Sequence, residues 1–86
     1  MGSNMPQDME KTAIELAAGA VLNAEKTGDF DGQSHKIQDA MKKKFGGSNW
    51  FVAFGKKGFF AFQTNVPSQG INIVIADHLI SIYKYE

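Results

Sequence analysis

The chain has 86 residues, no cysteine and a hydrophobic content of 43%. This length and composition predict one packed globular domain, and the lack of thiols excludes a disulfide framework, a cysteine nucleophile and a cysteine-ligated zinc site. The formal net charge is zero and all nine basic residues are lysines. Because arginine is the preferred side chain for recognising phosphate and guanine, nucleic-acid binding is disfavoured.

The ends of the chain and its hydropathy bear on where the protein works. No apolar stretch approaches the roughly 18 residues of a membrane span. No basic segment followed by an apolar one opens the sequence, so a secretory signal is not expected. We therefore expect a soluble protein of the cytoplasm that makes no membrane contact. Residues 1–6 are expected to form a flexible N-terminus, and residues 7–86 a single domain.

The first predicted element is a helix that begins at Pro6 and ends near Lys26. Proline is well placed in the first turn, where its missing N–H costs nothing. Asp8 and Glu10 suit the positive end of the helix dipole. Beyond Lys26, a segment rich in glycine and aspartate predicts a loop. Apolar residues at helical spacing predict a largely buried helix; they are Met9, Ala13, Leu16, Ala17, Ala20 and Ala24, widened by Ile14, Val21 and Leu22.

A second helix is predicted to begin at Ser34, whose hydroxyl can cap the helix N-terminus. It ends at the glycine pair of residues 46–47. Its last turn carries three lysines, which we interpret as helix-end charge on a solvated face rather than as a partner-binding patch. The helix has a narrower amphipathic stripe, formed by Ile37, Ala40, Met41, Lys44 and Phe45.

After residue 47 the apolar period changes to two, which predicts strands. The predicted strands are residues 50–54, 59–65, 71–75 and 78–85, joined by a tight turn at 55–58, a loop at 66–70 and a two-residue hairpin at 76–77. Strands that follow one another in the chain are expected to pair as a meander. The sequence therefore predicts an α+β fold, in which two N-terminal helices pack on a four-stranded antiparallel sheet.

The second strand should carry apolar side chains on both faces of the sheet. Phe60 and Phe62 share one face, whereas Phe59 and Ala61 point to the other. Because helices can cover only one face, the other is expected to expose an apolar patch of the kind that marks interfaces. This pattern predicts dimerisation or partner binding, and an exposed strand edge could accept a peptide as an added strand.

The sequence gives little support for catalysis. His35 and Asp39 are one helical turn apart, but two ligands alone make a weak metal site. A glycine-rich phosphate loop between strand and helix is missing, as is a serine in a nucleophile elbow. We therefore expect no enzymatic activity, no cofactor and no resident metal.

The segment at residues 57–62, Lys-Gly-Phe-Phe-Ala-Phe, makes single-stranded nucleic-acid binding the alternative function. Alternating aromatic residues after a basic residue and a glycine are typical of RNA-recognition and cold-shock strands, where rings stack on bases. Phe60 and Phe62 would stack, and Lys56 and Lys57 would contact phosphates. Two leading helices are the wrong element order for those domains, which favours packing of the aromatic rings against the helices.

The layout also resembles the eight-kilodalton class of dynein light chains over residues 12–86. The similar stretches are the helix end Met-Lys-Lys-Lys-Phe at 41–45, the strand Trp-Phe-Val-Ala-Phe-Gly-Lys at 50–56 and the closing Tyr-Lys at 83–84. Two helices followed by strands occur in the same order. An additional N-terminal strand of that family is expected to be missing, since only residues 1–5 could supply it.

This resemblance implies a non-enzymatic, homodimeric adaptor of a microtubule motor complex, associated with the cytoskeleton. In that family one strand crosses to the partner's sheet, and peptides, such as those of the dynein intermediate chain, add as a further strand beside that crossing strand. The second helix borders this groove and its N-terminus caps a peptide glutamine. The implied peptide-binding residues are Ser34, His35, Phe59, Ala61, Phe62, Gln63 and Thr64; the implied dimer interface is Phe51, Phe59, Phe60, Phe62 and Thr64, with residues 59–65 as the crossing strand.

Two positions depart from the family pattern. The histidine that follows the tryptophan in the family, which is linked to pH-dependent dimer dissociation, is Phe51 here. We therefore expect the pH switch to be absent. Phe59 stands where the family has a glycine that allows close backbone approach, which argues against the usual Thr-Gln-Thr peptide motif.

Overall fold

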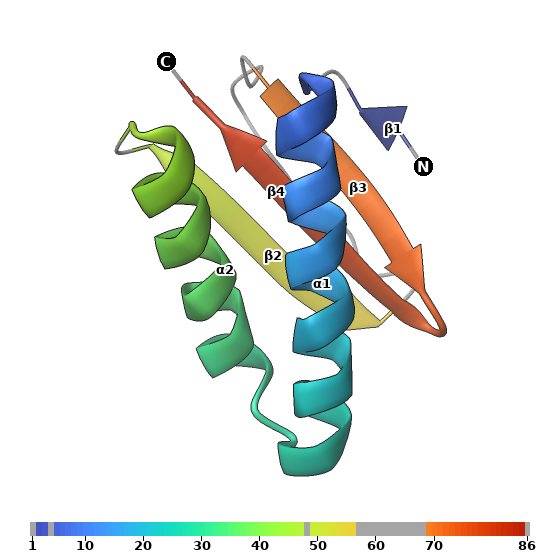
Figure 1. Cartoon of the computed structure of the whole chain (residues 1–86). Helices are drawn as coiled ribbons and strands as arrows, with labels where there is room; N and C mark the ends of the chain where they lie inside the picture. Colours follow the sequence, from blue (N-terminus) through green and yellow to red (C-terminus); the bar gives the residue numbers. More distant parts are fainter. Residues whose placement is uncertain (1, 4, 48, 57–68, 86) are drawn as a thin grey trace.

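The computed structural model describes residues 2–3, 5–47, 49–56 and 69–85. These residues form two helices on one face of an antiparallel sheet (Figure 1), which confirms the predicted α+β architecture. In chain order, the elements are β1 Gly2–Ser3, α1 Gln7–Thr27, α2 Phe30–Phe45, β2 Trp50–Lys56, β3 Gln69–Ile75 and β4 His78–Lys84. The strand predicted at residues 59–65 lies outside the described residues.

The order of the strands differs from the predicted meander. It is β1-β3-β4-β2, so β4 lies between β2 and β3 and pairs antiparallel with both. Consequently β2 and β3 run parallel to each other without being neighbours. Parallel strands cannot be joined by a tight turn and need a crossover connection of about a dozen residues. The turn predicted at residues 55–58 is accordingly wrong for Gly55 and Lys56, which belong to β2 opposite Leu79 and His78.

Strand β1 corrects the expectation that the N-terminal strand is missing. Gly2 pairs with Asn72 and Ser3 with Ile71 on the outer edge of β3. Met5, which follows this strand, is 8% exposed and belongs to the hydrophobic core. The N-terminal segment therefore contributes to both the sheet and the core.

Helix α1 agrees closely with its prediction. Ala13 and Ala17 are fully buried, and the helix ends at Gly28, whose φ of 75° is the left-handed conformation that favours glycine. Leu22 is the exception, because it is 62% exposed although it was placed on the buried stripe. Although α1 has 21 residues, no described helix is long and apolar enough to cross a membrane.

The hydrophobic core lies between the helices and the sheet. Ile37 and Met41 from α2 meet Trp50 from β2 and the isoleucines of β3 and β4. The indole Nε1 of Trp50 donates to the backbone oxygen of Gly46 at 2.8 Å, so its polar atom is satisfied. This bond and the buried ring fix the start of β2 against the end of α2.

Candidate functional site

The start of α2 lies one turn earlier than predicted. Asp29 is the N-cap, and its Oδ1 accepts a hydrogen bond from the backbone N–H of Gly32 at 2.9 Å. The prediction that Ser34 caps this helix is therefore wrong. Ser34 lies in the second turn, where its Oγ donates to the backbone oxygen of Phe30 at 3.1 Å. Its side chain is thereby placed on the flank of the helix rather than at its end.

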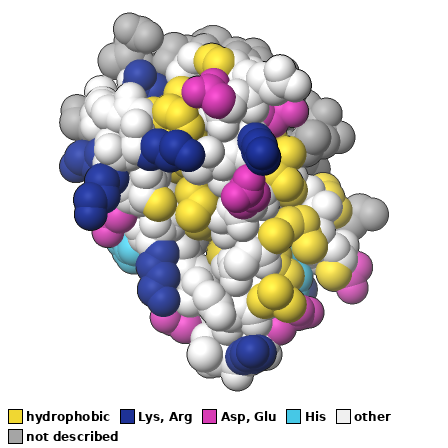
Figure 2. Space-filling model, viewed as in Figure 1, with side chains coloured by type: hydrophobic (Ala, Val, Ile, Leu, Met, Phe, Trp, Pro, Cys, Tyr) yellow, Lys and Arg dark blue, Asp and Glu magenta, His cyan; other side chains and the backbone are white. Residues whose placement is uncertain are grey.

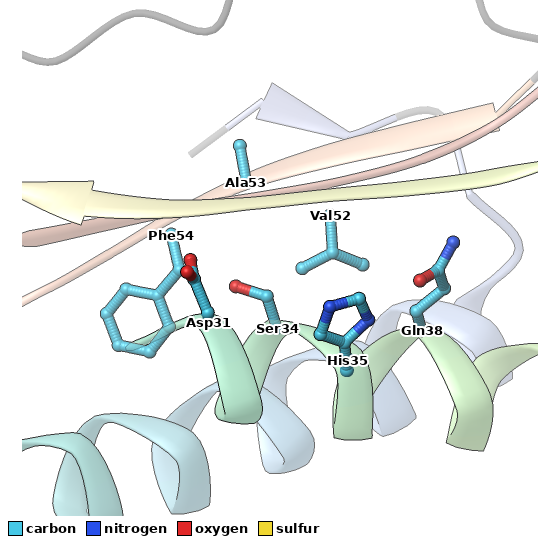
Figure 3. Close-up of a pocket in the computed structure, with 7 residues that line it drawn as sticks. All are labelled: Asp31, Ser34, His35, Gln38, Val52, Ala53 and Phe54. Atoms are coloured by element: carbon cyan, nitrogen blue, oxygen red, sulfur yellow. The ribbon is translucent and has the colours of Figure 1, made fainter. Parts of the chain in front are cut away.

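A groove of about 290 Å³ lies between α2 and β2 (Figure 3). The spacing of its α2 residues puts them on one face of the helix, one turn after another. This face is polar, whereas the face that packs into the core carries Ile37 and Met41. The lining residues are Asp31, Ser34, His35 and Gln38 from α2 and Val52, Ala53 and Phe54 from β2.

The outer edge of β2 runs along this groove. In the described part of the chain, no strand pairs with this edge. Tyr85 N donates to Asn49 O at 2.8 Å, which makes these two residues a hydrogen-bonded pair. Hydrogen-bonded and non-bonded pairs alternate along antiparallel strands. The N–H and C=O groups of Trp50, Val52 and Phe54 therefore point away from β4, toward the edge.

Gln38 closes one end of the groove. Its Nε2 donates to the backbone oxygen of Trp50 at 2.8 Å. This bond agrees with the outward direction inferred for that carbonyl group. The outward groups of Val52 and Phe54 have no neighbouring strand among the described residues. Among the described residues, the edge is thus bonded to α2 at Trp50 and pairs with no strand at Val52 and Phe54.

An aromatic cluster closes the other end. The ring centroids of Phe30 and Phe54 are 5.0 Å apart, and His78 lies 5.5 Å from Phe30 and 5.6 Å from Phe54. His78 Nε2 is 3.9 Å from Glu25 Oε2, whereas the buried Nδ1 has no hydrogen-bond partner in the described structure. The cluster joins the first turn of α2 to β2 and β4 next to Phe54, which lines the groove.

The face of the sheet away from the helices carries Phe51. This residue is 39% exposed and stacks on Tyr83, with ring centroids 6.3 Å apart. On the same face, Ser81 and Tyr83 donate hydrogen bonds to Asn72 Oδ1. Val74 is 50% exposed. The described part of this face therefore combines a polar network with apolar side chains that a second subunit could cover.

The sequence-predicted site residues divide into those in the groove, those described elsewhere (Phe51 on the outer face of the sheet and Lys56 at the end of β2) and those outside the described residues. Ser34 and His35 lie side by side in the groove. Those outside the described residues are Lys57, Phe59, Phe60, Ala61, Phe62, Gln63 and Thr64. Asp31 and Gln38 were missed, although their spacing of three to four residues from Ser34 and His35 places them on the same helix face.

Other functional features have weaker structural support. The described residues hold no cluster of three His, Asp or Glu side chains that could bind a metal. Figure 2 shows lysines interspersed with acidic side chains over the outer face of the helices, in keeping with a solvated surface. Of the residues assigned to nucleic-acid binding, Lys56 alone is described, and it is exposed at the end of β2.

The fold and its groove can now be compared with known proteins. The family model for dynein light chain type 1 matches residues 1–85. The chain belongs to the dynein light chain family. The resemblance predicted from the sequence is thereby confirmed. A search of curated proteins finds no match to this chain.

Two solved structures share the dynein light chain-like fold. Both are of the dynein light chain-like domain of the Fasciola hepatica calcium binding protein FhCaBP2, one native and the other a mercury derivative. Their TM-scores are 0.82 and 0.80, each at 11% identity, and each match covers all of this chain. The matches cover 88% and 89% of the solved chains. At this identity, the likeness establishes the fold alone.

Proposed function

We propose that this light chain is a non-enzymatic adaptor that forms a homodimer and binds extended partner segments by strand addition. The observation that carries the proposal is the outer edge of β2. Its outward N–H and C=O groups at Val52 and Phe54 lie beside the polar groove on α2. In strand addition, main-chain hydrogen bonds supply affinity and side-chain pockets supply selectivity. We propose that the edge pairs with the crossing strand of a second copy, and that partner peptides then add beside that strand, next to α2.

Membership of the family supports a place in a microtubule motor complex of the cytoplasm. The partners proposed are a second copy of the chain and peptides such as those of the dynein intermediate chain. Residues 59–65 as the crossing strand remain part of this proposal, as do the contacts assigned to Phe59, Phe60, Ala61, Phe62, Gln63 and Thr64. The exposed ring of Phe51 supports a second subunit on the outer face of the sheet.

A proline at position 52 tests the edge. Val52→Pro removes an outward N–H and leaves the hydrogen bonds between β2 and β4 intact, because those are made by the residues on either side. We expect this variant to sediment as a monomer and to lose binding of extended peptides. Val52→Ala is the matched control, since it shortens the side chain but keeps the N–H.

The measurements are sedimentation equilibrium over a range of protein concentrations, and titration calorimetry with peptides of the dynein intermediate chain. Circular dichroism would verify that both variants keep the fold. Full dimerisation and peptide binding by Val52→Pro would contradict strand addition at β2. Equal loss in Val52→Ala and Val52→Pro would assign the effect to the side chain rather than to the edge.

A further inference from the structure

Helix α1 has an outer stripe of apolar residues that the proposed function leaves unused, formed by Ile14, Ala18 and Leu22. Leu22 is 62% exposed, the largest value among the exposed large hydrophobic residues of the described chain, whereas Ala18 is exposed and Ile14 half-buried. Their spacing of four residues places them one above another on a different side of the helix from the fully buried Ala13 and Ala17. Figure 2 shows apolar side chains among charged ones on the helix side of the molecule.

The two ends of the outer stripe differ in shape. At the N-terminal end, a hollow of about 390 Å³ lies beside Ile14. Its other lining residues are Gln7, Glu10, Lys11 and Glu15. At the C-terminal end, the side chain of Leu22 projects into solvent. Because an α-helix rises 1.5 Å per residue, the projecting side chain and the hollow are about 12 Å apart along the helix.

A second copy of α1, lying antiparallel on the outer stripe, would match both ends. With a twofold axis at Ala18, residues at equal distances before and after this position face each other. Ile14 and Leu22 are each four positions from Ala18, so the Leu22 of each copy meets the hollow beside Ile14 of the other. Both copies contribute the same patch, as in other twofold interfaces. The small side chain at the axis allows the two helices to approach closely.

The charges beside the outer stripe are complementary under the same symmetry. Lys11 and Glu25 are each seven positions from the axis, and so face each other between copies. Glu10 and Lys26 are each eight positions from it and do the same. None of these four side chains forms an ion pair with a described lysine or carboxylate, and the Glu25 carboxylate lies 3.9 Å from the His78 imidazole. No charged residue of α1 faces a like charge in this arrangement.

We propose that the outer stripe of α1 is a self-association surface, on which a second copy of this chain docks antiparallel. The contact is separate from the dimer proposed at β2, because α1 lies over β3 and β4 on the helix side of the sheet (Figure 1). One chain can therefore make both contacts at once, and dimers can join into rows. A contact between single helices is smaller than the roughly 1,200 Å² of a standard interface, so free copies should associate weakly.

Sedimentation equilibrium of the full chain, from low micromolar to millimolar concentration, tests this surface. The mass at the lowest concentration gives the basic unit, which is a dimer if the proposed function holds and a single chain if it fails. We expect the average mass to rise with concentration toward at least twice this unit. Leu22→Asp should weaken this second association at least about tenfold, because each contact buries two copies of Leu22.

The residue next to Leu22 provides the matched control. Asn23→Asp adds the same charge at an exposed position of α1, which lines a separate hollow between α1 and α2. It should leave the second association unchanged. Circular dichroism would verify that each variant keeps the fold, as expected for substitutions at exposed positions.

An exchange of charges tests the antiparallel register. Lys11→Glu should weaken the second association about fivefold, since it opposes two glutamates twice in each contact. Lys11→Glu combined with Glu25→Lys should restore the association, because each new glutamate then faces a new lysine. Lys43→Glu makes the same change of net charge at an exposed position on α2 and should have little effect.

The results that would overturn this inference are distinct from those that concern β2. A mass that stays constant up to millimolar concentration would overturn it, as would equal association of Leu22→Asp and the unaltered chain. Equal weakening by Leu22→Asp and Asn23→Asp, or no recovery in the double charge exchange, would do the same. A basic unit of one chain would contradict the dimer proposed at β2 and leave the test of the outer stripe intact.

Discussion

The two edges of the sheet differ in what pairs with them. At the β3 edge, β1 pairs with Ile71 and Asn72, and Met5 continues from this strand into the core. At the β2 edge, no strand pairs within the described residues, and the Gln38 amide contacts the backbone at Trp50. Unpaired strand edges invite pairing with other chains, so folded proteins generally cover them. The difference supports the proposal that the interaction side of the molecule lies next to α2.

The helices behind the two edges match this division. Helix α1, which lies over β3 and β4, buries a stripe of alanines in the core. Helix α2 lies beside β2 and turns a polar row toward it, from Asp31 to Gln38. The β3 edge, which β1 covers in part, supports the fold, whereas the β2 edge, which has no partner strand among the described residues and lies beside a polar helix face, can support recognition.

The largest effect is expected where the β2 edge is anchored to the core. Trp50→Ala removes a buried indole ring and its hydrogen bond to Gly46 O. The cost should be about 3–5 kcal/mol of the free energy of unfolding, the range for truncating a large buried aromatic side chain. Urea denaturation followed by circular dichroism measures it.

The adjacent residue provides the control for Trp50. Phe51→Ala alters a side chain that is 39% exposed on the opposite face of the same strand. It should cost no more than about 1 kcal/mol when measured at a concentration where the protein is monomeric. Similar losses at positions 50 and 51 would show that β2 is not divided into a core face and an outer face.

A smaller effect is expected from a proline at the β3 edge. The two-residue hairpin makes Ile75 and His78 a hydrogen-bonded pair, so Val74 turns its N–H outward, as Val52 does at the other edge. Val74→Pro should change the free energy of unfolding by about 1 kcal/mol and leave dimerisation and peptide affinity unchanged. Val52→Pro should weaken binding about 10- to 100-fold, the cost of a main-chain donor lost from an interface.

Sedimentation equilibrium and calorimetry on the two proline variants, side by side, make this comparison. Retained binding in Val74→Pro together with lost binding in Val52→Pro would support recognition at β2. Equal impairment by both prolines would contradict the distinction between the edges.

Local sequence signals predicted the helices and the hairpin. The alanine spacing of α1, the glycines after both helices and the Ala76-Asp77 turn each act over a few residues, and the structure confirms them. The pairing of strands was not predictable in this way. Alternation of apolar residues tells which face a side chain occupies but not which strand lies next to it. A two-residue strand such as β1 has no alternation to detect.

Only part of the groove was predicted, again because local patterns do not show how distant segments pack. Ser34 and His35 were placed on the right helix, but its start was assigned one turn late. The residues before Ser34 include Gly32 and two aspartates, which together are typical of a loop. Gly32 lies within the helix, where its N–H donates to the Asp29 cap. A side chain at this position would collide with the same carboxylate. The position of β2 at one edge of the described sheet depended on the strand order and could not be inferred from local pattern.

The smallest effect concerns the hairpin that joins β3 to β4 and so supports the covered side of the sheet. Ala76 has a φ of 54°, a left-handed conformation that costs an alanine about 1 kcal/mol and a glycine almost nothing. Ala76→Gly should therefore stabilise the protein by about 0.5 kcal/mol, after the added flexibility of the unfolded chain is subtracted. Asp77→Gly, at the other loop position, lacks this relief because the positive φ belongs to Ala76, and it should destabilise. Thermal unfolding of both variants measures the difference. If Asp77→Gly stabilised the protein and Ala76→Gly did not, the left-handed residue would be Asp77 rather than Ala76. Peptide binding should be the same in both variants, since neither touches the β2 edge.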